Sequence, residues 1–122
     1  MTTITEDYVS FETAKLLKEK GFDNISSIMY KENGEICVNP KSVSSWRLKC
    51  WYPCLTLQMV MKWLRKEHKV NIEIHYNRFG ENYKYLIIYK PEVLDDIRSL
   101  GFYSYYEDAA EAAIKYCLEN LI

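Results

Sequence analysis

The residues of this sequence that could bind a metal or act as nucleophiles are four cysteines and two histidines. Cys50 and Cys54 are four positions apart, which is not the two-residue gap of a zinc knuckle, and no second pair accompanies them. The histidines, His68 and His75, belong to different predicted elements. The spacing therefore predicts small core or half-buried thiols, with no metal site.

Catalysis by a thiol would need a positioned base and an oxyanion-stabilising group. His75 lies on the polar side of a predicted strand and could meet Cys50 or Cys54 in the fold, but no local motif indicates an activated thiol. With four glycines the chain lacks a glycine-rich phosphate loop. We expect no catalytic residues, no cofactor and no enzyme.

Nucleic-acid binding is the alternative that the charge pattern favours most. Four basic residues recur at helical spacing and form what we call the basic face: Lys62, Arg65, Lys66 and Lys69. Tyrosine-bearing strands could add stacking platforms for bases. However, the helix dipole by itself favours basic residues near a helix end, and a net charge of −1 gives no support.

Protein binding is the leading hypothesis, because Met59 and Trp63 lie away from the apolar side of the predicted helix that carries the basic face. An exposed Met and Trp with Arg65 nearby have the composition of an interface centre. Two alternatives stay open. Either the pair belongs to an interface, most simply that of a symmetric homodimer, or the segment 46–51 folds over it.

The stretch 70–90 predicts the hairpin around which the fold is organised. Its first arm alternates apolar and polar residues, the period of a strand with one buried face, and a turn containing Gly80 follows. The second arm, 83–90, has apolar residues on both faces. It should therefore lie nearer the middle of a sheet than its partner.

A second hairpin is predicted over 25–38, because Asn33-Gly34 separates two β-prone runs and favours a type I′ turn with positive φ at both residues. The alternating stretch Trp46–Trp51 is either a further strand or a structured loop. Pro40 and three serines place a loop between these segments.

One helix is predicted before the 25–38 hairpin and another after it. The first spans 11–20, with Ser10 as the N-cap and Gly21 as the left-handed residue that ends it. The second starts with Pro53 in its first turn and continues to about Lys69. Its core-facing seam is formed by residues three or four apart: Leu57, Val60, Met61 and Leu64.

A third helix is predicted from the capping box Ser104–Glu107 to about Asn120, with four alanines that allow close packing on a sheet. The segment 92–100 before it is short and acidic. We interpret it as a connector with at most one helical turn.

These elements predict one α+β domain over residues 1–122. We expect an antiparallel sheet of two hairpins, about four or five strands, with three helices mainly on one face, in the order α-ββ-(β)-α-ββ-α. Composition is ordinary for a globular fold, with 48% apolar and 27% charged residues. The N-terminus lacks the pattern of a signal peptide and no apolar run has the length of a membrane span, so we expect a cytoplasmic protein with reduced cysteines and no membrane partner.

Three stretches of the sequence resemble a known group of proteins: residues 10–22, 56–65 and 106–121. They are similar to small uncharacterised proteins carried by phages, prophages and mobile elements of gut bacteria. The resemblance spans most of the chain. It implies a cytoplasmic accessory protein of a phage or mobile element, and it carries no known binding or catalytic residues over to this sequence.

Overall fold

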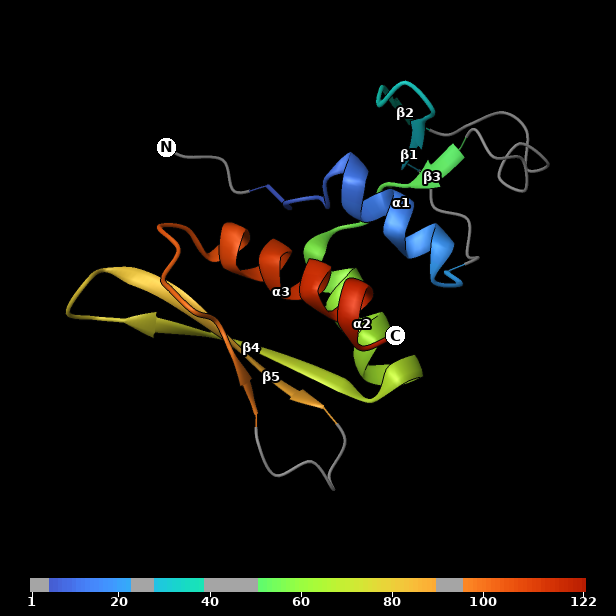
Figure 1. Cartoon of the computed structure of the whole chain (residues 1–122). Helices are drawn as coiled ribbons and strands as arrows, with labels where there is room; N and C mark the ends of the chain where they lie inside the picture. The colour runs from blue at the N-terminus through green and yellow to red at the C-terminus, as the bar shows by residue number, and fades with distance from the viewer. Residues whose placement is uncertain (1–4, 23–27, 39–50, 90–95) are drawn as a thin grey trace. The chain divides into compact units, whose positions relative to one another are not determined.

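The computed structural model describes residues 5–22, 28–38, 51–89 and 96–122, which form an α+β fold as predicted (Figure 1). The chain divides into two compact units, Met1–Thr56 and Leu57–Ile122. The first unit contains α1 (Phe11–Glu19), β1 (Ile28–Lys31), β2 (Ile36–Val38) and β3 (Trp51–Pro53). The second contains α2 (Leu57–His68), β4 (Val70–Asn77), β5 (Asn82–Tyr89), β6 (Ile97–Arg98) and α3 (Tyr106–Asn120).

Helix α1 begins and ends as the sequence predicts. The Ser10 hydroxyl accepts a hydrogen bond from the Thr13 amide at 3.3 Å, which satisfies one of the unpaired donors of the first turn. At the other end Gly21 has a φ of 99°, and the Phe22 amide donates to the Leu17 carbonyl at 3.0 Å. The 11–20 prediction is therefore confirmed to within one residue.

The hairpin of β1 and β2 is confirmed, but the predicted turn type is wrong. The Lys31 amide donates to the Glu35 carbonyl at 2.8 Å, which leaves a loop of three residues instead of two. Within this loop Gly34 has a φ of 89°, whereas Asn33 does not have a positive φ. A type I turn followed by a left-handed glycine is the usual geometry of three-residue hairpins.

Pro53 lies in strand β3, so the expectation that it stands in the first turn of α2 is wrong. Its partner in the ladder is Met29 of the central strand β1, and the sheet order is β2-β1-β3. Because β3 is an edge strand, a residue without an N–H is tolerated there. Helix α2 consequently begins at Leu57. Of the stretch predicted as strand or loop, only Trp51 falls within the described residues, and it belongs to β3.

The first unit is held together by aromatic and polar contacts between α1 and its sheet. The Phe11 ring lies 5.5 Å from that of Tyr30 and 5.6 Å from that of Tyr52. The Tyr30 hydroxyl donates to the Val9 carbonyl at 2.6 Å, and the Lys18 ammonium donates to the Trp51 carbonyl at 2.7 Å. Buried Tyr30 thus has both an apolar environment and a partner for its hydroxyl.

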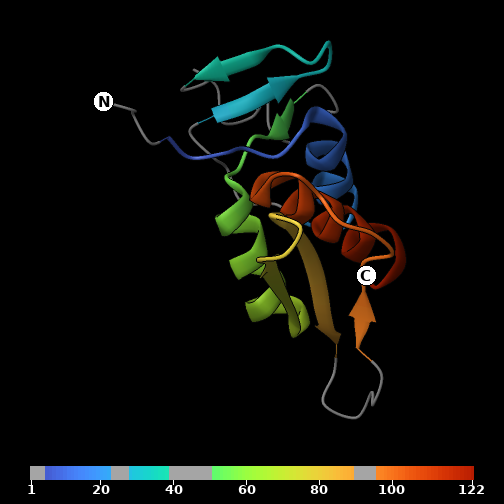
Figure 2. The same cartoon turned by 90° about the vertical axis from the view of Figure 1, so that its left-hand side faces the viewer.

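The second unit is built on the predicted hairpin. Strands β4 and β5 pair over eight residues, from Val70 opposite Tyr89 to Asn77 opposite Asn82. Among the described strands the sheet order β4-β5-β6 confirms that the second arm is the central one. Helices α2 and α3 pack against the hairpin from one side (Figure 1 and Figure 2). The α2 seam predicted from the sequence is buried in full.

Two local predictions in the second unit fail. Ile97 and Arg98 pair with β5 as strand β6, where a connector was expected, although the preceding residues 90–95 lie outside the described ranges. At the start of α3 the N-cap is Tyr105 and no side chain caps it, so the Ser104–Glu107 capping box does not form. Each hairpin gains one short extra strand, and the result is two sheets of three strands where one sheet of about four or five was expected.

Gly34→Ala should destabilise the protein by about 1–2 kcal/mol, because an L-residue is strained at this positive φ. The added Cβ would also lie 3.4 Å from the Phe11 ring. Gly101 offers a matched control, since its φ is not positive and an added Cβ meets no atom within 4 Å. Urea denaturation should show Gly101→Ala unchanged or slightly more stable. Equal losses for the two variants would contradict the assigned turn.

Candidate functional site

The basic face predicted from the sequence is present on α2 and the residue that follows it. All four of its side chains are exposed, and none forms an ion pair within the described part of the chain. Three of them lie in the last turns of the helix or at its end, where the dipole favours positive charge. The geometry is compatible with phosphate contacts, and it is equally that of a solvated helix face.

Met59 and Trp63 differ in their surroundings. Met59 is exposed, whereas the Trp63 indole is half-buried and meets the His68 ring edge-on at 4.7 Å. Part of the indole is thus covered within its own helix. The alternative covering segment, 46–51, lies almost wholly outside the described residues. The interface predicted for this pair stays a prediction.

A cluster of tyrosine rings connects the hairpin to α3. The Tyr76 and Tyr83 rings, on opposite strands, are 5.2 Å apart, and Tyr83 meets Tyr106 edge-on at 6.1 Å. The Tyr106 hydroxyl also accepts a hydrogen bond from Gln58 of α2 at 3.0 Å. In addition, Tyr83 and Tyr103 exchange two backbone hydrogen bonds of 2.7 Å. These contacts bring residues 102–106 beside the hairpin.

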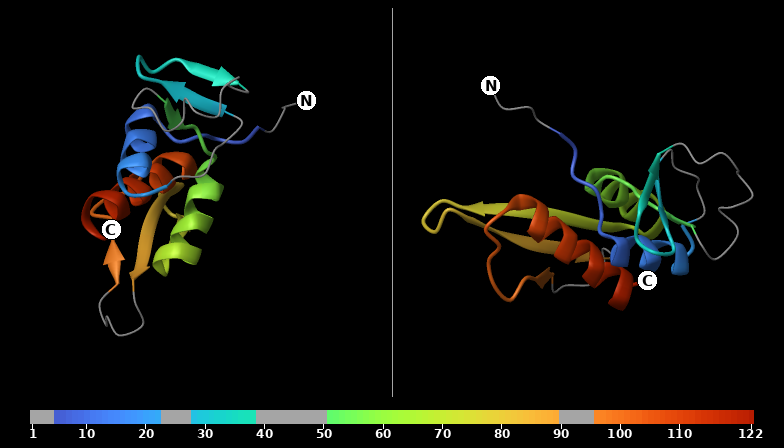
Figure 3. Two further views of the ribbon diagram at one scale, coloured as in Figure 1. Left: turned by 90° about the vertical axis from the view of Figure 1, so that its right-hand side faces the viewer. Right: turned by 90° about the horizontal axis from the view of Figure 1, so that it is seen from above.

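Around this cluster the second unit exposes large aromatic side chains, which we call the aromatic end: Tyr76, Phe102 and Tyr105. Their exposed fractions are 56%, 56% and 66%, and Phe79 at the hairpin tip is 95% exposed. The tip extends beyond the start of α3 (Figure 3). Single exposed apolar residues are common on proteins, but here three of them belong to segments that the Tyr83–Tyr103 backbone bonds bring side by side.

Sequence reasoning missed the aromatic end. Eleven tyrosines pointed to half-buried sheet faces and interfaces in general, but not to a location. The location depends on the paired backbones of Tyr83 and Tyr103, which are twenty residues apart. The adjacent aromatic residues of 102–106 were the available signal, although one sequence alone cannot show which of them face solvent.

The buried thiols of Cys54 and Cys117 are not activated as nucleophiles. Burial raises the pKa of the Cys54 thiol, and a hydrogen bond with the Tyr30 side chain opposes this only partly. Burial raises the pKa of Cys117 to about 12. Reactive cysteines have lowered pKa values, so neither thiol resembles a catalytic one.

His75 is exposed and lies 3.3 Å from the Glu73 carboxylate. Within the described ranges no three His, Cys, Asp or Glu side chains are grouped to hold a metal ion.

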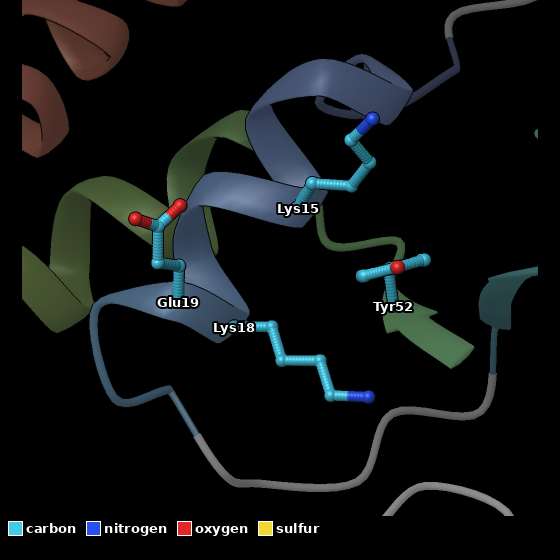
Figure 4. Close-up of a pocket in the computed structure, with 4 residues that line it drawn as sticks. All are labelled: Lys15, Lys18, Glu19 and Tyr52. Atoms are coloured by element: carbon cyan, nitrogen blue, oxygen red, sulfur yellow. The ribbon is translucent and has the colours of Figure 1, made fainter. Parts of the chain in front are cut away.

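A pocket of about 460 Å³ in the first unit is lined by Lys15, Lys18, Glu19 and Tyr52 (Figure 4). Its two ammonium groups already have partners inside the unit. Lys15 lies 5.0 Å from the centre of the Phe11 ring, and Lys18 lies 5.1 Å from that of Tyr52 besides its bond to the Trp51 carbonyl. The lysines therefore stabilise the packing of α1 on β3, and the pocket carries no further chemistry.

Comparison of the chain with protein-family models, with curated proteins and with solved structures found no match. In the part of the chain that the structure describes, no helix combines the length and the apolar composition needed to cross a bilayer.

Alkylation of the native protein near pH 8 should modify Cys117 at least about 100-fold more slowly than alkylation in urea, because a pKa of about 12 leaves almost no thiolate. Half-buried Cys37 serves as the internal reference. Peptide mass spectrometry after timed quenching separates the sites. Equal native rates at Cys37 and Cys117 would show that the α3 thiol is accessible and ionised.

Proposed function

We propose that this protein acts by binding another protein, and that the aromatic end of the second unit is the main contact surface. The observation that supports this most is the exposure of Tyr76, Phe102 and Tyr105 on segments that the paired Tyr83 and Tyr103 backbones bring together. In line with the resemblance of its sequence, we propose that it is a cytoplasmic accessory protein of a phage or mobile element. The proposed mode of action is binding, without catalysis.

The energetics of aromatic side chains support a binding role. Covering the exposed half of one ring, on the order of 100 Å², contributes about 2.5 kcal/mol. Part of the aromatic end is already ordered, because the Tyr76 ring packs at a tilted angle on that of Tyr83 and the backbone beside Phe102 and Tyr105 is held by the hydrogen bonds of Tyr103. A rigid surface loses little conformational entropy on binding, which leaves more of this energy for affinity.

Charge beside the aromatic end favours a protein partner over a nucleic acid there. Glu107 and Asp108 follow Tyr105 and Tyr106 directly, in the first turn of α3. Carboxylates repel phosphate groups but complement lysine and arginine side chains at the rim of a protein interface. The partner that fits is a protein with an apolar depression bordered by basic residues.

Photo-crosslinking in the cells that produce the protein tests this proposal. A photoreactive phenylalanine analogue in place of Tyr105 should yield a discrete adduct with a different protein. Ile36 of β2, 58% exposed, is the control position, and it should yield no such adduct. Tyr105→Ser should remove co-purification of that partner while changing stability by less than about 0.5 kcal/mol. The absence of a specific adduct at position 105 would contradict the proposal.

The second candidate function is nucleic-acid binding by the basic face, favoured by the exposure of all four side chains and their lack of ion pairs among the described residues. A protein that neutralises phosphates releases counterions, so its affinity falls steeply with salt. Four contacts would give a log–log slope of about −3.6 on duplex DNA.

Lys62→Glu/Lys66→Glu should abolish any binding to duplex DNA or RNA at low salt, because it reverses half of the basic face. Lys31→Glu/Arg98→Glu changes the net charge equally at exposed positions outside α2 and should retain binding. Fluorescence anisotropy over a salt series measures both. Undetectable binding of the wild-type protein at low salt would remove this candidate.

A further inference from the structure

Strand β4 is a long, regular edge strand. It pairs with β5 along its whole length, while on its other side no strand of the described residues, 5–22, 28–38, 51–89 and 96–122, pairs with it. Natural proteins commonly protect such edges with proline, lysine or a bulge. β4 has no proline and no lysine, and its ladder runs through eight consecutive pairs without a bulge.

Hydrogen bonds of the central strand show which β4 residues face outward. Tyr83 bonds to Tyr103, and Tyr85 accepts a bond from the Ser99 amide, so the odd-numbered residues of β5 direct their backbone groups toward β6. The even-numbered residues of β5 must then bond to β4. Their partners there are the odd-numbered residues, such as Glu73 opposite Leu86.

It follows that the even-numbered residues of β4 direct their N–H and C=O groups away from the sheet. These residues are Val70, Ile72, Ile74 and Tyr76. Outside the β4–β5 ladder, no hydrogen bond of these backbone groups is found among the described residues. Because water or another strand must satisfy them, this edge is a template for strand addition.

We propose that two copies of the chain pair through their β4 strands, antiparallel and centred on Ile74. A two-fold axis at Ile74 places Ile72 opposite Tyr76 of the second copy, and Asn71 opposite Asn77. Aliphatic–aromatic and amide–amide pairs are favourable across antiparallel strands. The two sheets become one sheet of six strands, and the exposed Tyr76 ring gains cover.

Charge favours this register over the two registers that are centred one residue away. Centring on Ile74 places Glu73 of each copy opposite His75 of the other, so the imidazole can donate to the carboxylate twice per dimer. Centring on Glu73 would oppose two carboxylates, and like charges directly opposite are destabilising. Centring on His75 would leave Glu73 opposite Asn77. Both side chains are nearly half exposed in the single chain and thus accessible to a second copy.

This self-association and the proposed binding of another protein share Tyr76 but depend on different groups. The partner surface is an apolar patch on one end of the sheet, whereas the dimer depends on backbone groups along one edge. Crosslinking at Tyr105 and oligomeric state therefore report on the two proposals separately.

The test measures the mass of the full chain by light scattering from the micromolar to the millimolar range. The wild-type protein should shift from monomer to dimer. Ile74→Pro removes an outward N–H that β5 does not use, so it should be monomeric while its circular dichroism stays that of a folded protein. A wild-type protein that is monomeric throughout, or a folded Ile74→Pro variant that dimerises normally, overturns the proposal.

A charge exchange keeps the test decisive if Ile74→Pro fails to fold. His75→Glu opposes two carboxylates at both symmetric pairs and should weaken dimerisation about tenfold. Glu73→His/His75→Glu has the wild-type composition and restores complementary pairs, so it should dimerise like the wild type. Equal dimerisation of the single variant and the wild type would show that these residues do not face each other.

Discussion

The pairing of β4 with β5 is the constraint on which the second unit depends. Since strand side chains alternate between faces, a shift of one residue would move Ile72 and its apolar neighbours to the open side of the sheet. The observed register keeps Val70 and Ile72 buried on the face where α2 and α3 pack. It also brings the Tyr76 and Tyr83 rings into contact at one end, and among the described strands it leaves one edge of β4 unpaired.

The proposed recognition role is based on what the described residues expose and on what they bury. Burial removes the nucleophilic character of Cys117 and of Cys54, and the lysines near the first-unit pocket are engaged with aromatic rings. What faces outward is a set of aromatic rings and a row of backbone groups. Tyr76 takes part in both, because its ring belongs to the aromatic end and its backbone to the open edge. Pairing of two copies would therefore bring two aromatic ends onto one sheet.

The ends of α1 and the main hairpin could be predicted from the sequence, whereas the turn type at Asn33-Gly34, the start of α3 and the aromatic end could not. Ser10 and Gly21 mark the ends of α1 because capping and positive φ depend on a few adjacent residues. The element that contains Pro53 was predicted wrongly, because a first helical turn and an edge strand both tolerate its missing N–H. The basic face could be placed by helical periodicity. The aromatic end could not, because it requires the pairing of Tyr83 with Tyr103.

Amide hydrogen exchange along β4, measured by NMR in dilute solution, tests the central claim most directly. With β5 as the only neighbour, the amides of Glu73 and His75 should be protected, while those of Ile72 and Ile74 exchange rapidly. At high concentration all four should become protected as the edges pair. Protection of Ile72 and Ile74 in the dilute monomer, with rapid exchange at Glu73 and His75, would contradict the assigned register and the open edge derived from it.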